Sequence, residues 1–145
     1  MKLPTDLNAF IESLNAAGVK YLIVGGYAVG FHGWPRFTGD IDFFVEPSEE
    51  NARRIIEALR RFGFGSMDLS PRDFTQSGIV VQLGFPPNRI DLMTSIDGVD
   101  FSAAWKDRVA ANIDQLPTNF ISREHLLANK RAVGRPKDLA DAGEI

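Results

Sequence analysis

The order of apolar and polar residues along the chain predicts helices that alternate with strands. Near the start, apolar residues recur at the helical spacing i, i+3, i+4 and i+7, and they are Leu7, Phe10, Ile11 and Leu14. Thr5 or Asp6 is suited to begin this helix and Gly18 to end it. Continuous apolar runs then predict strands at 21–24 and 41–45.

Glycine and capping residues mark the elements around these two strands. Gly25-Gly26 interrupts the first strand, and a short helical turn is predicted over 27–31. After the second strand, Ser48 is suited to cap a helix with an acidic first turn, and Gly63 is suited to end it. The predicted buried face of this helix comprises Ala52, Ile55, Ile56, Leu59 and Phe62.

The middle of the chain predicts a hairpin and a further helix. Residues 64–78 are rich in turn formers, and two strands are predicted at 79–85 and 89–93. The short loop between them indicates a hairpin, so the sheet is expected to be mixed and not all parallel. A helix is predicted over 101–111, followed by irregular backbone over 113–121 with at most one short edge strand.

Two C-terminal helices complete the predicted order. Ser122 is suited to cap a helix over 123–133, Gly134 ends it, and Pro136 is suited to open the last helix. The predicted fold class is α/β (α+β), a small mixed β-sheet flanked by helices. No linker-like segment divides the chain, so a single domain over residues 1–145 is expected.

Composition narrows the class of protein. The chain has 145 residues, no Cys and two His. This excludes a disulfide framework and a Cys-based zinc site, and it favours oxygen ligands for any metal. The net charge of −3 disfavours a protein that coats nucleic acid non-specifically. No apolar run approaches the roughly 20 residues of a membrane span and no signal-peptide core is visible, so a cytoplasmic location without a membrane partner is expected.

Charge is distributed unevenly along the predicted elements. Between residues 37 and 52 there are five acids and no base, namely Asp40, Asp42, Glu46, Glu49 and Glu50. Between residues 122 and 137 there is one acid and five bases, namely Arg123, Lys130, Arg131, Arg135 and Lys137. Facing one cleft, the two segments would suit a metal–polyphosphate ligand. The alternative is that these charges lie on solvated helix surface.

Three carboxylates lie in or beside predicted strands, where Asp is depleted. Asp40 and Asp42 share one face because side chains alternate along a strand, and Asp91 is placed by the same alternation. Adjacent carboxylates repel each other unless one is protonated or a cation lies between them. If the strands are neighbours, the three converge on a site for one or two Mg²⁺ ions. Alternatively, Asp40 and Asp42 are solvent-facing acids on an edge strand.

The diglycine adds a candidate phosphate site. A strand, then Gly25-Gly26, then a helical turn would present backbone N–H groups that receive phosphate. Most such pairs are plain turns, but this one lies close enough to Asp40 and Asp42 in sequence to line the same cleft.

These motifs together resemble the nucleotidyltransferase superfamily, which is built on the DNA polymerase β-like fold. The matching segments are Gly25-Gly26, Arg36-Phe37-Thr38-Gly39-Asp40-Ile41-Asp42 and Ile90-Asp91-Leu92. The Arg-x-Thr-x-Asp-x-Asp form is similar to that of bacterial proteins related to the AbiEii-type toxins of toxin–antitoxin systems, and to small minimal relatives. A late motif of Lys130, Arg135, Lys137-Asp138 and Asp141 matches those proteins too.

The resemblance implies a metal-dependent enzyme that transfers a nucleoside monophosphate from an NTP, such as ATP, to an acceptor and releases pyrophosphate. It implies that Asp40, Asp42 and Asp91 are the catalytic residues and hold Mg²⁺ or Mn²⁺. It assigns nucleotide binding to Gly25, Gly26, Arg36, Thr38, Lys130, Lys137 and Asp138. The helices of residues 122–145 would close the cleft, with Lys137 and Asp138 either neutralising phosphate or forming an ion pair.

The acceptor and the partners stay open. The resemblance allows tRNA, a protein or a small molecule as acceptor, and a role as a toxin with a cognate antitoxin. Because the motifs occupy nearly the whole chain, a second subunit or another protein is expected to supply acceptor recognition. Two alternative functions remain: a non-catalytic module of the same fold that binds a nucleotide or a partner, and a metal-dependent phosphohydrolase. The three Asp residues argue against the first, and the diglycine and strand order favour transfer over hydrolysis.

Overall fold

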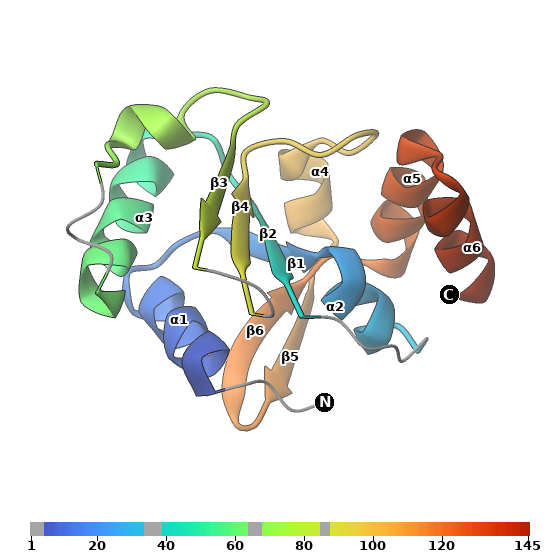
Figure 1. Cartoon of the computed structure of the whole chain (residues 1–145), viewed down its shortest axis with the longest axis horizontal. Helices are drawn as coiled ribbons and strands as arrows, with labels where there is room; N and C mark the ends of the chain where they lie inside the picture. The colour runs from blue at the N-terminus through green and yellow to red at the C-terminus, as the bar shows by residue number, and fades with distance from the viewer. Residues whose placement is uncertain (1–4, 34–38, 64–67, 85–87) are drawn as a thin grey trace.

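The computed structural model describes residues 5–33, 39–63, 68–84 and 88–145. Figure 1 shows the helices and strands in chain order. They are α1 (Thr5–Ala16), β1 (Tyr21–Val24), α2 (Gly25–Phe31), β2 (Ile41–Val45), α3 (Glu49–Phe62), the 3₁₀ helix η1 (Pro71–Phe74), β3 (Val80–Leu83), β4 (Ile90–Met93), α4 (Phe101–Lys106), β5 (Val109–Ile113), β6 (Leu116–Phe120), α5 (Arg123–Val133) and α6 (Pro136–Glu144).

The strands of the described residues form one six-stranded sheet in the order β3-β4-β2-β1-β6-β5. The pairs β2–β4 and β1–β6 are parallel, whereas β1–β2, β3–β4 and β5–β6 are antiparallel. The predicted α/β class with a mixed sheet and the β3–β4 hairpin are therefore confirmed. Because β2 lies inside the sheet, the alternative that its acids mark an edge strand is wrong.

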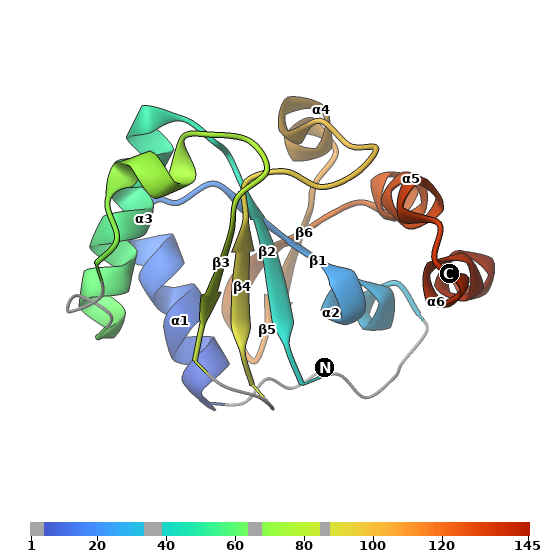
Figure 2. The same cartoon turned by 45° about the horizontal axis from the view of Figure 1, so that its top comes forward.

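Helices cover both faces of the sheet. Figures 1 and 2 show α1 and α3 on one face, and α2 on the other with α5 and α6 beyond it. Phe43 points to the α1 side, where its ring meets that of Phe10 edge-on at 5.5 Å. The next residue, Phe44, points to the opposite side and meets Phe101 of α4 at 5.0 Å. The same alternation turns Asp42 toward α2.

The predicted helix ends are found at the expected residues. The Ser48 hydroxyl accepts a hydrogen bond from the Asn51 backbone N–H at the start of α3, and Ser122 does the same for His125 at the start of α5. Gly63 and Gly134 end these helices with φ of 108° and 72°, in the left-handed region. Each side-chain cap stabilises its helix by about 1 kcal/mol, so local sequence suffices to place both helices.

Two predictions for residues 101–121 are wrong. The helix predicted over 101–111 ends at Lys106, and Val109–Ile113 is strand β5, in which exposure alternates with period two. The segment 113–121 is not irregular with at most an edge strand, because β6 lies inside the sheet between β1 and β5. The turn between them, Asp114-Gln115, has φ of 49° and 67°, as in a two-residue hairpin turn.

The start of α2 also differs from the prediction. The helical turn predicted over 27–31 begins two residues earlier, so Gly25 and Gly26 form its first turn and do not precede it as a break. As for membranes, none of the helices among the described residues has the length and apolar character needed to cross a bilayer.

Candidate functional site

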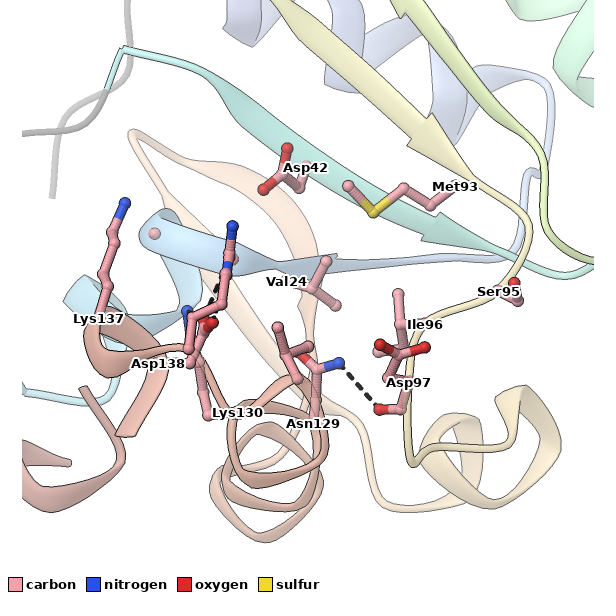
Figure 3. Close-up of a pocket in the computed structure, with 14 residues that line it drawn as sticks. Val24, Asp42, Met93, Ser95, Ile96, Asp97, Asn129, Lys130, Lys137 and Asp138 are labelled. Carbon is pink, nitrogen blue, oxygen red and sulfur yellow. Dashed lines mark hydrogen bonds and ion pairs between the residues drawn. The ribbon is translucent and has the colours of Figure 1, made fainter. Parts of the chain in front are cut away.

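A cavity of about 300 Å³ lies between the sheet and the two C-terminal helices, which is within the size range of small-molecule sites. Figure 3 shows the side chains that line it. The sheet side contributes Val24, Gly25, Gly26 and Asp42, the segment after β4 contributes Met93, Ser95, Ile96 and Asp97, and the α5–α6 side contributes Asn129, Lys130, Val133, Arg135, Lys137 and Asp138. The cavity therefore joins four segments that are separate in sequence.

Acidic and basic segments meet at this cavity. Asp42 lies on one side and Lys130 and Lys137 on the other, and Arg135, directly before α6, also lines the cavity. Arg123 and Arg131 are exposed and do not line it, so for these two the solvated-surface alternative holds. The remaining basic residues of the segment line the cavity together with Asp138.

Asp42 and Asp91 face each other across the parallel strands β2 and β4. Asp91 is buried, with 5% of its surface exposed, and Asp42 is half-buried. Burial raises the pKa of Asp42 to about 6, and the charge of Asp91, a hydrogen bond to Asp91 and the charge of Asp40 act in the same direction. The site thus holds a carboxyl group whose charge is disfavoured.

Arg89 binds Asp91 of this pair and also contacts Asp40. Its guanidinium donates to both oxygens of Asp91, from Nε to Oδ1 at 2.9 Å and from Nη2 to Oδ2 at 3.1 Å. Its Nη2 also lies 3.3 Å from Oδ2 of Asp40, and its backbone N–H donates to Oδ1 of Asp40. One cation is therefore shared by Asp40 and Asp91, and its positive charge opposes the rise in the Asp42 pKa.

Gly25 packs directly against Asp42. Its φ is +66°, and a Cβ at this position would overlap the Asp42 carboxylate. Glycine is required here both by the left-handed backbone and by the close approach. The first turn of α2 and the acidic strand are thereby fixed next to each other.

The carboxylates of the site supply oxygen ligands of the kind that divalent cations prefer. Among the residues that the structure describes, no three His, Asp or Glu side chains are gathered as a ready-made metal centre. The adjacent carboxylates of Asp42 and Asp91 nevertheless match the oxygen ligands of Mg²⁺, and their mutual repulsion is relieved by a cation. The pair fits a divalent ion, with Asp40 close by and bound to Arg89.

On the α5–α6 side, Lys130 is held in an ion-pair network. Its Nζ lies 3.3 Å from Oδ1 of Asp138 and 3.2 Å from Oδ2 of Asp141, and all three residues are buried. Arg135 donates to Oδ2 of Asp138 at 2.6 Å, and this hydrogen bond is the largest of the effects that lower the pKa of Asp138. The network joins α5 to α6.

The sequence-predicted site residues are partly brought together. Six of them line the cavity, namely Gly25, Gly26, Asp42, Lys130, Lys137 and Asp138. Asp40 and Asp91 do not line it, and lie beside Asp42 in and next to the strands. Asp138 pairs with Lys130 and Arg135, whereas the exposed Lys137 forms no ion pair with a residue of the described chain. Arg36 and Thr38 lie outside the described residues.

Comparison with known proteins supports the fold. The structure is similar to the crystal structure of an antigenic nucleotidyltransferase-like protein from Paracoccidioides brasiliensis, with a TM-score of 0.57 over 97% of this chain and 72% of that chain. The chain has a nucleotidyltransferase-like fold. The identity of 19% limits this likeness to the fold itself. No family model and no curated protein matches the sequence.

Sequence reasoning missed several residues of this candidate site. Arg89 was not assigned a role, although the spacing Arg89-x-Asp91 places both side chains on one strand face. The wall after β4 was missed too, and there Asn129 Nδ2 donates to the backbone oxygen of Asp97 at 2.9 Å. Because that segment has no regular periodicity, no local signal in the sequence could have shown that it faces α5.

Proposed function

We propose that the protein is a metal-dependent nucleotidyltransferase that transfers a nucleoside monophosphate from an NTP to an acceptor. The observation that carries the proposal is the pair of cross-strand carboxylates, Asp42 and Asp91, with Asp42 on a cavity whose opposite wall is basic. A nucleoside triphosphate with bound cations has the matching charge pattern. The similarity of the fold to that of the nucleotidyltransferase-like protein from Paracoccidioides brasiliensis supports the same class of reaction.

The two ends of the cavity suit different parts of a nucleotide. Lys137 gives one end of the cavity a positive charge that suits the phosphates, since it forms no ion pair with a described residue, whereas Lys130 and Arg135 are paired with Asp138. Gly25 and Gly26 lie beside it in the first turn of α2 and leave room for a close approach. The other end presents apolar side chains, Met93 and Ile96, which suit the sugar and base.

Asp42 and Asp91 would hold Mg²⁺ or Mn²⁺, and Asp40 would complete the acidic cluster. The bound cation would neutralise charge on the phosphates and make the attacking hydroxyl more acidic. The protein's own contribution is to position the α-phosphate between the acidic strands and the basic helices, and to stabilise the pyrophosphate with the lysines. The acceptor hydroxyl would form the new ester bond as the bond to pyrophosphate breaks.

A labelling experiment tests the proposal. The protein is incubated with Mg²⁺ or Mn²⁺, each α-labelled NTP including ATP, and fractionated tRNA, protein and small-molecule acceptors. Label on one fraction with release of pyrophosphate supports transfer and identifies the acceptor class. The variant Asp42→Asn is expected to abolish the transfer, whereas Asp68→Asn, at an exposed acid that does not line the cavity, is expected to retain it.

The alternative function is a non-catalytic nucleotide-binding module. It is favoured by one observation: Arg89 already occupies both oxygens of Asp91, so one of the acidic residues is neutralised within the protein itself. Binding of NTP that depends on Asp42, without label transfer to any fraction, would support this alternative. Release of inorganic phosphate without pyrophosphate would instead indicate a phosphohydrolase.

The biological setting is also part of the proposal. The AbiEii-like motif suggests that an active enzyme modifies a cellular acceptor as a toxin, with an antitoxin or a second subunit as partner. Expression that arrests growth only when Asp42 is intact would support the toxin role. If a strain that expresses the wild type grows as well as one that expresses Asp42→Asn, the toxin role is contradicted. Such a result would not affect the proposal of nucleotidyl transfer.

A further inference from the structure

Four charged side chains form a two-by-two array where β2 and β4 begin, with Asp42 and Asp91 in the strands and Asp40 and Arg89 directly before them. Asp42 lies opposite Asp91 in the parallel register. Asp40 lies opposite Arg89, since the Arg89 backbone N–H donates to Asp40 Oδ1 and the Arg89 carbonyl accepts from Ile41. Residues two apart in a strand share a face, so Asp40 aligns with Asp42 and Arg89 with Asp91. The guanidinium is therefore built into the acidic cluster.

Arg89 contacts carboxylate oxygens that would otherwise be available to a metal ion. It donates to Oδ1 and Oδ2 of Asp91 and approaches Oδ2 of Asp40 at 3.3 Å. Bidentate contact between a guanidinium and a carboxylate is among the stronger charge-assisted interactions in proteins. When all four groups are ionised, the cluster of three acids and one base has a net charge of −2. A divalent cation at Asp42 and Asp91 would be close to a fixed positive charge.

We propose that Arg89 is a resident counter-ion that competes with a divalent cation for the carboxylates of Asp40 and Asp91. It keeps the cluster partly neutralised while no metal–nucleotide complex is in the cavity, and it weakens metal binding by the nucleotide-free protein. The inference rests on the proposed function in one respect, that Asp42 and Asp91 hold a divalent ion. It assigns to Arg89 a positioning role that acts through these carboxylates.

The test is a Mn²⁺ titration of the nucleotide-free protein, followed by electron paramagnetic resonance of free Mn²⁺. Arg89→Met removes the charge, and about tenfold tighter Mn²⁺ binding is expected because a nearby like charge no longer opposes the ion. Arg89→Lys keeps the charge but loses the bidentate geometry, so its affinity is expected to stay within about threefold of the wild type. Arg61→Met is the matched control, since Arg61 forms an exposed pair with Glu57.

Thermal unfolding provides a second measurement. In EDTA, Arg89→Met is expected to melt below the wild type because the buried Asp91 loses its bidentate partner, and added Mn²⁺ should reduce this difference. If Arg89→Met does not fold, Arg89→Gln takes its place, because its amide retains a hydrogen bond to Asp91. A residue that only orients Asp91 would give the opposite pattern, with weaker Mn²⁺ binding in Arg89→Met and also in Arg89→Lys.

The outcomes separate this inference from the proposed function. Unchanged or weaker Mn²⁺ binding by Arg89→Met, together with label transfer by the wild type, overturns the competition and leaves the transferase standing. Tighter binding by Arg89→Met without label transfer by the wild type supports the competition and favours the non-catalytic module. The absence of Mn²⁺ binding in the wild type and every Arg89 variant overturns both the competition and the metal site.

Discussion

Asp42 stands directly opposite Asp91 in the parallel pairing of β2 and β4. Burial and the neighbouring charges raise the pKa of Asp42 to about 6, well above the ordinary value of 3.8. The fully ionised form of the pair is thus unfavourable. The stability of the protein should therefore depend on pH, and a bound cation should relieve the repulsion between the two carboxylates.

The first prediction concerns this pH dependence in the absence of metal. Because folding raises the Asp42 pKa, its contribution to stability is complete below about pH 4 and is lost as the pH rises through about 6. Asn is neutral at every pH and its amide can donate to Asp91. Asp42→Asn is therefore expected to exceed the wild type in free energy of unfolding by about 1–3 kcal/mol above pH 7 and by much less at pH 4.

Urea denaturation in EDTA from pH 4 to pH 8 measures this difference. Asp68→Asn serves as the control, because Asp68 is exposed, and it should follow the wild type throughout. Parallel stability curves for Asp42→Asn and the wild type would show that Asp42 titrates normally in the folded protein.

The second prediction concerns Gly25. Gly25→Ala would force a left-handed backbone on Ala and would push the new Cβ into the Asp42 carboxylate. Gly84→Ala is a matched control, because Gly84 has a similar φ of +78° but open space around the Cβ position. Each substitution is expected to cost about 1 kcal/mol for the backbone, and Gly25→Ala should in addition displace Asp42.

Chemical denaturation and a Mn²⁺ titration separate the two contributions. Both variants should lose stability, whereas Gly25→Ala alone should lose Mn²⁺ affinity. Equal Mn²⁺ affinities would mean that the contact between Gly25 and Asp42 does not position the carboxylate.

Much of the fold could be predicted because local patterns specify it. The alternation in Ile41-Asp42-Phe43 placed Asp42 on the face opposite Phe43, and the structure has Phe43 against Phe10 of α1. Ser48 and Gly63 marked the ends of α3 because caps satisfy helix-end backbone groups through nearby residues. In both cases the physical cause lies within a few residues of its effect.

The β5–β6 hairpin could not be predicted, because its local sequence favours other structures. Ala110 and Ala111 favour a helix by propensity, and Pro117 argues against an interior strand. Pro117 is tolerated because β6 pairs with β1 at Phe120, whereas the register partner of Pro117 is Asn112 of β5. Tertiary pairing overrides local preference here, and only the assembled sheet shows it.

The sequence predicts which residues belong to the candidate site better than it predicts their contacts. The basic segment of α5 and α6 was predicted to face the acids, but its sequence does not show that Lys130 is buried between Asp138 and Asp141. That contact depends on how two helices pack, with Gly134 between them. Arg89 was missed because a base two residues before a strand Asp is ordinarily a surface charge.

The third prediction concerns the buried network of Lys130. Lys130→Met would remove the ammonium group that lies 3.3 Å from the buried carboxylate of Asp138 and 3.2 Å from that of Asp141. Removing one partner of a buried ion pair costs about 3 kcal/mol or more, so the melting temperature should fall markedly. Lys137→Met, the same substitution at an exposed position of α6, should leave it nearly unchanged. Equal stability of the two variants would show that the network does not hold α5 to α6.

The fourth prediction assigns phosphate binding to Lys137. This side chain lines the cavity and forms no ion pair with any described residue, so its charge is available to a ligand. Lys137→Met is expected to weaken binding of an NTP with Mg²⁺ by about three- to tenfold at low ionic strength, and by less in high salt because exposed charges are screened. Arg131→Met removes a cation that is exposed on α5 outside the cavity, and it should bind NTP like the wild type. Calorimetric titration at two salt concentrations measures both variants. If they lose affinity equally, the effect comes from overall charge, and Lys137 has no specific contact with the phosphates.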